Sequence, residues 1–224
     1  MNNYYSQKLS AERLRLCYEI AHPRVKRYLD AEIGFVLDKL NPSSLVLEFG
    51  CGYGRVLQRL AEKAKIVVGI DTSPASLMSA RKKITNVTKY FLAEMNAVEL
   101  GFCDGQFDVV VCIQNGISAF KVDQRKLIRE AMRVTRSGGR VLFSSYAERF
   151  WGERLKWFEI QAAHGLIGEI DYDKTGHGVI AGKDGFKATT VSAENFVALI
   201  SDLGIIPQIT EVDNSSIFCE ILVA

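Results

Sequence analysis

The stretch L-V-L-E-F-G-C-G-Y-G-R at residues 45–55 predicts the fold on which the rest of the chain is built. Its apolar start, followed closely by glycine, fits a short buried strand, and residues 56–62 (V-L-Q-R-L-A-E) have the pattern of a helix. A strand that turns through glycines into a helix brings backbone N–H groups and a helix N-terminus to one point. Glycine suits this turn because the backbone angles are unusual and a Cβ would block a ligand. The stretch predicts a binding loop for the polar end of a ligand; the alternative is a βα turn that binds nothing.

The glycine spacing separates two classes of ligand. The dinucleotide fingerprint is G-x-G-x-x-G, whereas this chain has G-x-G-x-G at Gly50, Gly52 and Gly54, with Glu48 two residues before the first glycine. This E-x-G-x-G-x-G pattern resembles motif I of the class I S-adenosylmethionine (SAM) dependent methyltransferases. The resemblance implies that the loop, including Cys51, packs against the methionine part of SAM. It also implies that Glu48 helps hold the loop and the ammonium group of the ligand.

Buried strands alternate with helices through residue 146, which predicts a parallel sheet covered on both faces. The expected strands are 45–47, 66–70, 88–92, 107–113 and 140–145, and the expected helices are 9–20, 25–40, 56–62, 74–84 and 123–135. The last third differs: it predicts an aromatic-rich helix at 150–165, short antiparallel strands within 169–190, a helix at 192–203 and closing strands at 205–212 and 217–223. A dinucleotide domain would continue with parallel units, whereas a closing hairpin resembles the methyltransferase fold.

We therefore expect an α/β fold, a Rossmann-like seven-stranded, mostly parallel sheet with an antiparallel C-terminal hairpin and helices on both faces. At 224 residues the chain is expected to be one domain. Its expected parts are an N-terminal helical cap (1–40), a SAM-binding core (41–146), a substrate-covering insertion (147–191) and a C-terminal helix and hairpin (192–224).

Polar residues follow the predicted strands at their carboxyl ends, where ligands of parallel sheets bind. Asp71 ends the second strand 19 residues after Gly52 and precedes Thr72. A carboxylate there can accept hydrogen bonds from both ribose hydroxyls, and the position resembles the motif II acid of the methyltransferases. The alternative is an aspartate that only caps the next helix.

Two further strand ends complete the expected cofactor site. By the resemblance, Glu94, Met95 and Asn96 hold the adenine, although the family more often has Asp at the first position. Ile113 and Gln114 follow the fourth strand, where the family lines the methionine and faces the methyl group. Arg55 is a second candidate for the SAM carboxylate, with an exposed arginine as an equal alternative. The chain lacks the [D/N]-P-P-[Y/F/W] motif of enzymes that methylate nucleic acid bases.

Methyl transfer from a sulfonium needs alignment, a dry pocket and, for a protonated acceptor, a base. The chain has three histidines, and His164 and His177 lead as candidate bases because they lie in the expected covering segment; His22 is the third. A structural or exposed role is the alternative for each. Candidate residues for the acceptor site are Tyr4, Tyr5, Tyr18, Asn115 and Trp151, with simple packing as the alternative.

Composition favours a small-molecule partner. The net charge of +2 predicts neither a nucleic acid surface nor a membrane surface. The five cysteines form no C-x-x-C pair and no Cys/His metal spacing, so no metal is expected, and a reduced, cytoplasmic compartment is favoured. No signal peptide or membrane-length apolar run is visible.

The sequence thus predicts a methyltransferase that transfers a methyl group from SAM to a small-molecule acceptor and releases S-adenosylhomocysteine (SAH). The alternatives are an NAD(P)-dependent oxidoreductase, a SAM-binding protein without turnover, and a protein methyltransferase. The methyl acceptor, the methylated atom and the oligomeric state are left open at this point.

Overall fold

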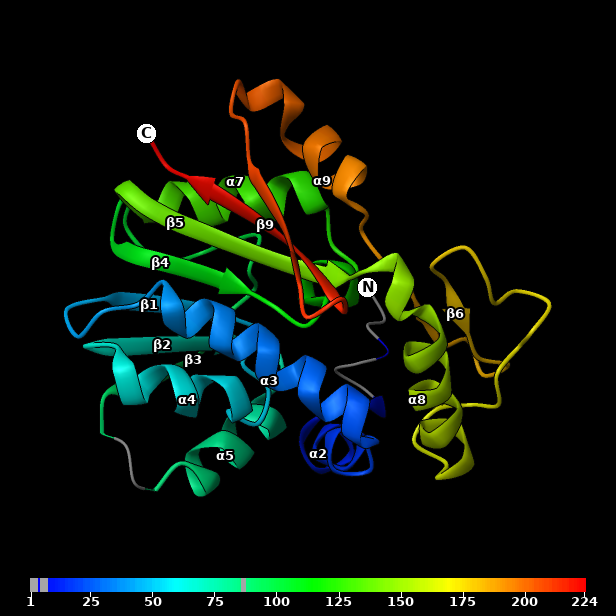
Figure 1. Cartoon of the computed structure of the whole chain (residues 1–224). Coiled ribbons are helices and arrows are strands. Elements are labelled where there is room, and N and C mark those ends of the chain that lie inside the picture. The colour runs from blue at the N-terminus through cyan, green and yellow to red at the C-terminus, as the bar shows by residue number, and fades with distance from the viewer. Residues whose placement is uncertain (1–3, 5–7, 86–87) are drawn as a thin grey trace.

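The computed structural model describes residues 4, 8–85 and 88–224. A seven-stranded sheet with strand order β3-β2-β1-β4-β5-β9-β8 forms its centre (Figure 1). The strands are β1 (Leu45–Phe49), β2 (Ile66–Asp71), β3 (Tyr90–Glu94), β4 (Phe107–Cys112), β5 (Thr135–Tyr146), β8 (Gln208–Val212) and β9 (Ser216–Leu222). The first five pair in parallel, and the last two pair antiparallel. The predicted fold class is therefore confirmed.

Helices cover both faces of the sheet, as expected for buried parallel strands. One face is covered by α3 (Pro23–Asp38), α4 (Arg55–Lys63) and α5 (Pro74–Lys83). The other is covered by the short α6 (Gly116–Ala119), by α7 (Gln124–Val134) and by α9 (Ala193–Ile200). Short 3-10 turns at Glu148–Phe150 and Ser201–Leu203 complete the backbone. Ser73 caps α5 and Ser192 caps α9, since each hydroxyl accepts a hydrogen bond from the backbone N–H three residues on.

A third apolar cluster lies beyond the carboxyl ends of β4 and β5, where Figure 1 shows α8. It joins α2 (Ala11–Glu19), the N-terminal half of α3, α8 (Trp151–Ala163) and the hairpin of β6 (Ile180–Ala181) and β7 (Lys187–Ala188). The expected helical cap at residues 1–40 is thus divided. The C-terminal half of α3, with Ile33 and Val36, belongs to the layer that covers the sheet, and α2 joins the cluster at the strand ends.

Several strand boundaries differ from the prediction; β1 extends to Phe49 rather than 47, and β8 begins at Gln208 rather than 205. β3 spans Tyr90–Glu94 rather than 88–92, so Glu94 is the last residue of the strand and pairs with Asp71 of β2. β5 begins at Thr135 rather than 140, because the chain passes from α7 directly into extended backbone before Gly138 and Gly139. Gly138 and Gly139, a pair typical of turns, here lie within the early part of a strand.

Gly69 in the middle of β2 lets the glycine loop lie close against the sheet. A Cβ on Gly69 would lie 2.2 Å from Leu57 Cδ1 and 2.9 Å from both Cβ and Sγ of Cys51. We expect Gly69→Ala to lower the free energy of unfolding by about 1–3 kcal/mol, because the side chains around it must shift.

Urea denaturation of both proteins measures this effect. Gly34→Ala is the matched control, since Gly34 lies inside α3 with nothing within 4 Å of an added Cβ. There, alanine should raise the free energy of unfolding by about 0.4–1 kcal/mol. Equal stability changes in the two variants would contradict the close packing at Gly69.

Within the described ranges, no helix is both long and apolar enough to cross a membrane.

Candidate functional site

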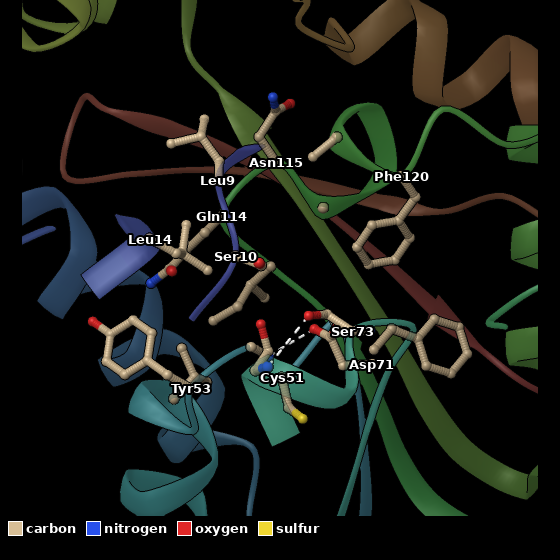
Figure 2. Close-up of a pocket in the computed structure, with 18 of the residues that line it drawn as sticks. Leu9, Ser10, Leu14, Cys51, Tyr53, Asp71, Ser73, Gln114, Asn115 and Phe120 are labelled. Carbon is tan, nitrogen blue, oxygen red and sulfur yellow. Dashed lines mark hydrogen bonds between the residues drawn. The ribbon is translucent and has the colours of Figure 1, made fainter. Parts of the chain in front are cut away.

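The candidate site is a pocket at the carboxyl ends of the parallel strands. The sheet order reverses between β1 and β4, the switch point at which open α/β sheets bind ligands. The pocket has a volume of about 200 Å³ and is lined by the ends of β1, β2 and β4, the residues that follow β3, the glycine loop, α2 and α8. Figure 2 shows Asp71 and Ser73 beside the loop at Cys51, with Leu14 and Phe120 flanking the pocket from two sides.

The glycine loop of residues 50–54 forms the floor of the pocket next to β1. Gly50 has φ +68°, and a Cβ there would lie 2.5 Å from Phe120 Cε1, so both conformation and space require glycine. On the opposite side Leu14 of α2 reaches over the loop, and its Cδ2 lies 3.2 Å from the position of a Cβ on Gly52. The loop is therefore held between α6 and α2.

Asp71 is fixed at the end of β2 by the backbone that surrounds it. Its Oδ2 accepts a hydrogen bond from the Gly52 N–H at 2.9 Å, and its Oδ1 accepts one from the Ser73 N–H at 2.8 Å. Burial raises the pKa of this carboxyl, and the same backbone hydrogen bonds oppose the rise. Ionised, it keeps free lone pairs that can accept further hydrogen bonds from a ligand in the pocket.

Glu48 is the second carboxylate of the pocket and is almost completely buried, with 4% exposure. Among the residues that the structure describes, none hydrogen-bonds its Oε2. Burial raises its pKa to about 8; the nearby Arg55 guanidinium opposes this rise and the Asp71 charge adds to it. A buried carboxylate without a donor is costly to maintain, so a cationic or donor group would be favoured beside it.

Gln114 forms the opposite wall after β4, with its backbone at φ +57°. Its N–H donates to Glu32 Oε2 at 2.7 Å and lies 2.8 Å from Ser144 Oγ. Its side-chain Oε1 accepts a hydrogen bond from Arg55, and its buried Nε2 has no partner among the described residues. The Arg55 guanidinium also lies 4.5 Å from the ring centroid of Tyr18.

Glu32 of α3 holds this wall from behind and does not line the pocket. It is fully buried, and Ser144 Oγ donates to its Oε2 at 2.9 Å. Burial raises the pKa of Glu32 to about 7, opposed by the hydrogen bonds from Ser144 and Gln114. Glu32 therefore ties α3 to the backbone of the β4 loop.

Asn115 connects the same loop to the covering segment. Its Nδ2 donates to the Thr189 carbonyl at 2.9 Å, and its Oδ1 accepts a hydrogen bond from Ser145 Oγ at 2.8 Å. Ser145 Oγ in turn accepts from the Val191 N–H at 2.9 Å. The side-chain amide is therefore occupied within the protein, although the residue lines the pocket.

The structure brings together most of the residues singled out from the sequence. Those that line the pocket are Glu48, Gly50, Cys51, Gly52, Asp71, Thr72, Met95, Asn96, Ile113, Gln114, Asn115 and Tyr18. Gly54 instead starts α4 behind the loop, and Glu94 is exposed and outside the lining.

The remaining candidates lie elsewhere. The Tyr4 hydroxyl donates to Asp184, and Tyr5 lies outside the described residues. Trp151 packs in the cluster at the strand ends and not in the pocket wall. His164 and His177 are exposed, and neither lines the pocket. The geometry therefore gives no support to either histidine as the base.

Several lining residues were not singled out from the sequence. They are Leu9, Leu14, Cys17, Phe120, Tyr146 and Gln161, whereas Trp157 and Phe158 belong to the aromatic-rich helix predicted at 150–165. Glu32, which supports the wall, was also missed, although a signal existed. It lies on the apolar face of its helix, three residues after Leu29 and four before Val36. A lone carboxylate on a buried helix face requires a polar partner.

The sheet order, the antiparallel hairpin and the pocket at the switch point define a Rossmann-like α/β ligand-binding domain. The family model described as a methyltransferase domain matches residues 46–139. The 2-methyl-6-phytyl-1,4-hydroquinone methyltransferase of Synechocystis sp. is 31% identical over 137 residues, which are 57% of this chain and 42% of that protein. The chain spans about half or less of the curated relatives it matches.

Solved structures share the fold over nearly the whole chain. The N-methyltransferase NodS of Bradyrhizobium japonicum WM9, in complex with SAH, has a TM-score of 0.63 at 16% identity and covers 98% of each chain. The magnesium protoporphyrin IX methyltransferase of Synechocystis PCC 6803, with bound SAH, has a TM-score of 0.64 at 17% identity, covering 99% of this chain and 97% of that one. The methyltransferase-domain match and these structural neighbours support the class I SAM-dependent methyltransferase family that the sequence resembles.

Proposed function

We propose that the protein transfers a methyl group from SAM to a small-molecule acceptor. The observation that carries the proposal is the pair of unpartnered buried atoms on two residues that line the pocket, Glu48 Oε2 and Gln114 Nε2. The methionine end of SAM presents an ammonium, which suits the carboxylate, and a carboxylate, which suits an amide N–H and the Arg55 guanidinium. Each orphaned atom thus finds a ligand group of the complementary kind.

The rest of the pocket fits the nucleoside end of the same ligand. Asp71, oriented by two backbone N–H groups, is suited to accept hydrogen bonds from ribose hydroxyls. Met95 and Asn96, which follow β3 and line the pocket, are the proposed contacts for the adenine. Glu94 is exposed, so we assign it at most a peripheral contribution.

When bound, SAM supplies a methyl carbon that is activated by the positively charged sulfur. After transfer of the methyl group, the rest of the molecule leaves as the thioether SAH. The chain's own residues would bind and orient this group and exclude water from the reacting centre. Leu14 over the glycine loop and the aromatic residues of α8 are suited to that exclusion. In this scheme 41–146 binds SAM, residues 147–191 and α2 cover the acceptor, and 192–224 completes the sheet.

The acceptor is proposed to be a small molecule because the covering elements close directly over the strand ends. The hydroquinone methyltransferase among the relatives acts on a small aromatic molecule by its name, which agrees with this class. A protein side chain as acceptor is the alternative. Incubation with methyl-labelled SAM and separated metabolite or protein fractions distinguishes the two by which fraction gains label.

A nicotinamide dinucleotide is disfavoured by the glycine loop itself. The pyrophosphate of such a cofactor would bind at the loop, next to the Glu48 carboxylate and under Leu14. We expect saturating SAH to raise the melting temperature by several degrees, since ligand at about 100 times its Kd adds about 2.7 kcal/mol. NADH at the same concentration should leave the melting temperature unchanged. The reverse pattern in thermal unfolding would overturn the assignment.

A further inference from the structure

The lining of the pocket is divided by charge. Its charged members are Glu48, Arg55 and Asp71, and all three belong to strand ends or the start of α4. The opposite side, which we term the roof, is formed by α2, the end of β5 and α8. The roof consists of Leu14, Cys17, Tyr18, Tyr146, Trp157, Phe158 and Gln161. It contributes no charged residue to the lining within the described chain.

The roof is aromatic, and contacts between its elements hold its rings in place. The rings of Tyr18 and Trp157 have centroids 5.9 Å apart, and those of Trp157 and Phe158 are 5.6 Å apart. Trp157 Nε1 donates to the Cys17 carbonyl at 2.8 Å, which joins α8 to α2. Aromatic surfaces held in this way favour a planar ring that can stack or pack edge to face.

Gln161 is the polar exception in the roof. It is 3% exposed and lines the pocket, yet its side-chain amide has no hydrogen bond to any described residue. The amide atoms are not enclosed by the protein, so a ligand group in the pocket can reach and pair with them. The amide offers both a donor and an acceptor, so it suits a hydroxyl or carbonyl group.

A formally charged acceptor is disfavoured at this surface. It would leave water for a wall of aromatic rings, and the nearby Arg55 guanidinium, 4.5 Å from the Tyr18 ring centroid, already donates to Gln114 and is assigned to the SAM carboxylate. The Arg154 guanidinium lies 4.5 Å from the Tyr146 ring centroid, but it is not part of the lining. It donates to the carbonyls of Gly178 and Ala188, at 2.9 and 3.1 Å.

We propose that the roof is the acceptor subsite, that it takes an uncharged planar aromatic molecule, and that the Gln161 amide pairs with a hydroxyl or carbonyl group of that molecule. This inference rests on the proposed function, because it assigns the acceptor side of the same pocket. It makes Gln161 a specificity-determining residue, with Trp157 and Phe158 as the surfaces against which the ring packs.

Three probes of matched size test the chemistry on the full chain saturated with SAH. They are naphthol (planar and neutral), naphthoate (planar and anionic) and decahydronaphthol (neutral and not planar), with dissociation constants measured by saturation-transfer NMR near neutral pH. We expect naphthol to bind about tenfold more tightly than either of the other two. Equal or tighter binding of naphthoate, or no binding of naphthol to a chain that binds SAH, would overturn the proposal.

Gln161→Met removes the amide and keeps the length of the side chain. It should weaken naphthol binding about fivefold, the worth of one hydrogen bond, and leave the Kd for SAH unchanged. Lys156→Ala, at an exposed position of the same helix, is the matched control and should change neither value. Unchanged naphthol affinity in Gln161→Met would refute the role of Gln161. Failure of the wild-type chain to bind SAH would instead refute the proposed function.

Discussion

Asp71→Asn should weaken SAH binding by about 10- to 100-fold, measured by isothermal titration calorimetry. The carboxylate accepts backbone hydrogen bonds from Gly52 and Ser73, and its remaining lone pairs are the proposed acceptors for the ribose hydroxyls. Charge-assisted hydrogen bonds of this kind contribute about 1.5–3 kcal/mol each. An amide keeps one acceptor oxygen but presents N–H donors where the second oxygen was.

Glu94→Gln provides the matched control for Asp71. Both acids end neighbouring strands and pair in register, but Glu94 is exposed and does not line the pocket. We expect its loss to change the Kd for SAH by about twofold or less, as for an exposed charge. Equal losses in the two variants would contradict the proposed contacts, and unchanged binding in Asp71→Asn would remove Asp71 from the site.

Glu48 should make SAH binding depend on pH. Its pKa is raised to about 8 by burial, so it carries a proton in the free protein at neutral pH. The ligand's ammonium favours the ionised carboxylate, and the proton must therefore leave on binding. If only the ionised form binds, affinity rises about 50-fold between about pH 6 and about pH 8. In Glu48→Gln this rise should be absent, and titration in buffers of different ionisation enthalpy should show that no proton is released.

Glu32→Gln is the control that separates the effect of Glu48 on the pH dependence of SAH affinity from the effect of any buried carboxyl. Glu32 is also buried, with its pKa raised to about 7, but it bonds Gln114 and Ser144 and lies outside the lining. Its loss should leave the pH dependence of SAH affinity in place. A flat profile in Glu32→Gln together with an unchanged profile in Glu48→Gln would refute the assignment of Glu48.

Both carboxyls also predict the pH dependence of stability in the free protein. Their folded pKa values lie above the ordinary value of 4.5, so the folded state binds protons more tightly than the unfolded state. The stabilisation is complete below about pH 4.5 and is lost as pH rises through about 7 to 8. Denaturation at several pH values should therefore show less loss of stability toward about pH 8 in either glutamine variant than in the wild type.

The strand-end residues of the site could be predicted because their positions depend on the local succession of strand, turn and helix in the sequence. A strand that ends in a carboxylate and turns into a helix places that carboxylate at one edge of a parallel sheet, whatever the distant contacts are. This reasoning located Glu48, Asp71 and Gln114, which line one pocket. It also included Glu94, where a two-residue shift of the strand boundary makes the acid the exposed end of β3.

The roof could not be predicted because it depends on contacts between distant segments. Trp157 lies next to Cys17 across 140 residues of sequence, and no local pattern indicates that pairing. The aromatic-rich helix was predicted, but which of its faces meets the pocket was not. For the same reason His164 and His177 were expected near the pocket, whereas they lie at the end of α8 and in the loop before β6.

The position of Leu14 across the glycine loop has a consequence for the order of substrate binding in the proposed reaction. Helix α2, which carries Leu14, is joined to α8 through the Trp157 indole, and its first N–H, at Ala11, donates to Ser76 of α5. In the proposed reaction, SAM at the glycine loop would lie beneath an acceptor held by α2 and α8. We therefore expect sequential kinetics in which SAM binds first and SAH leaves last.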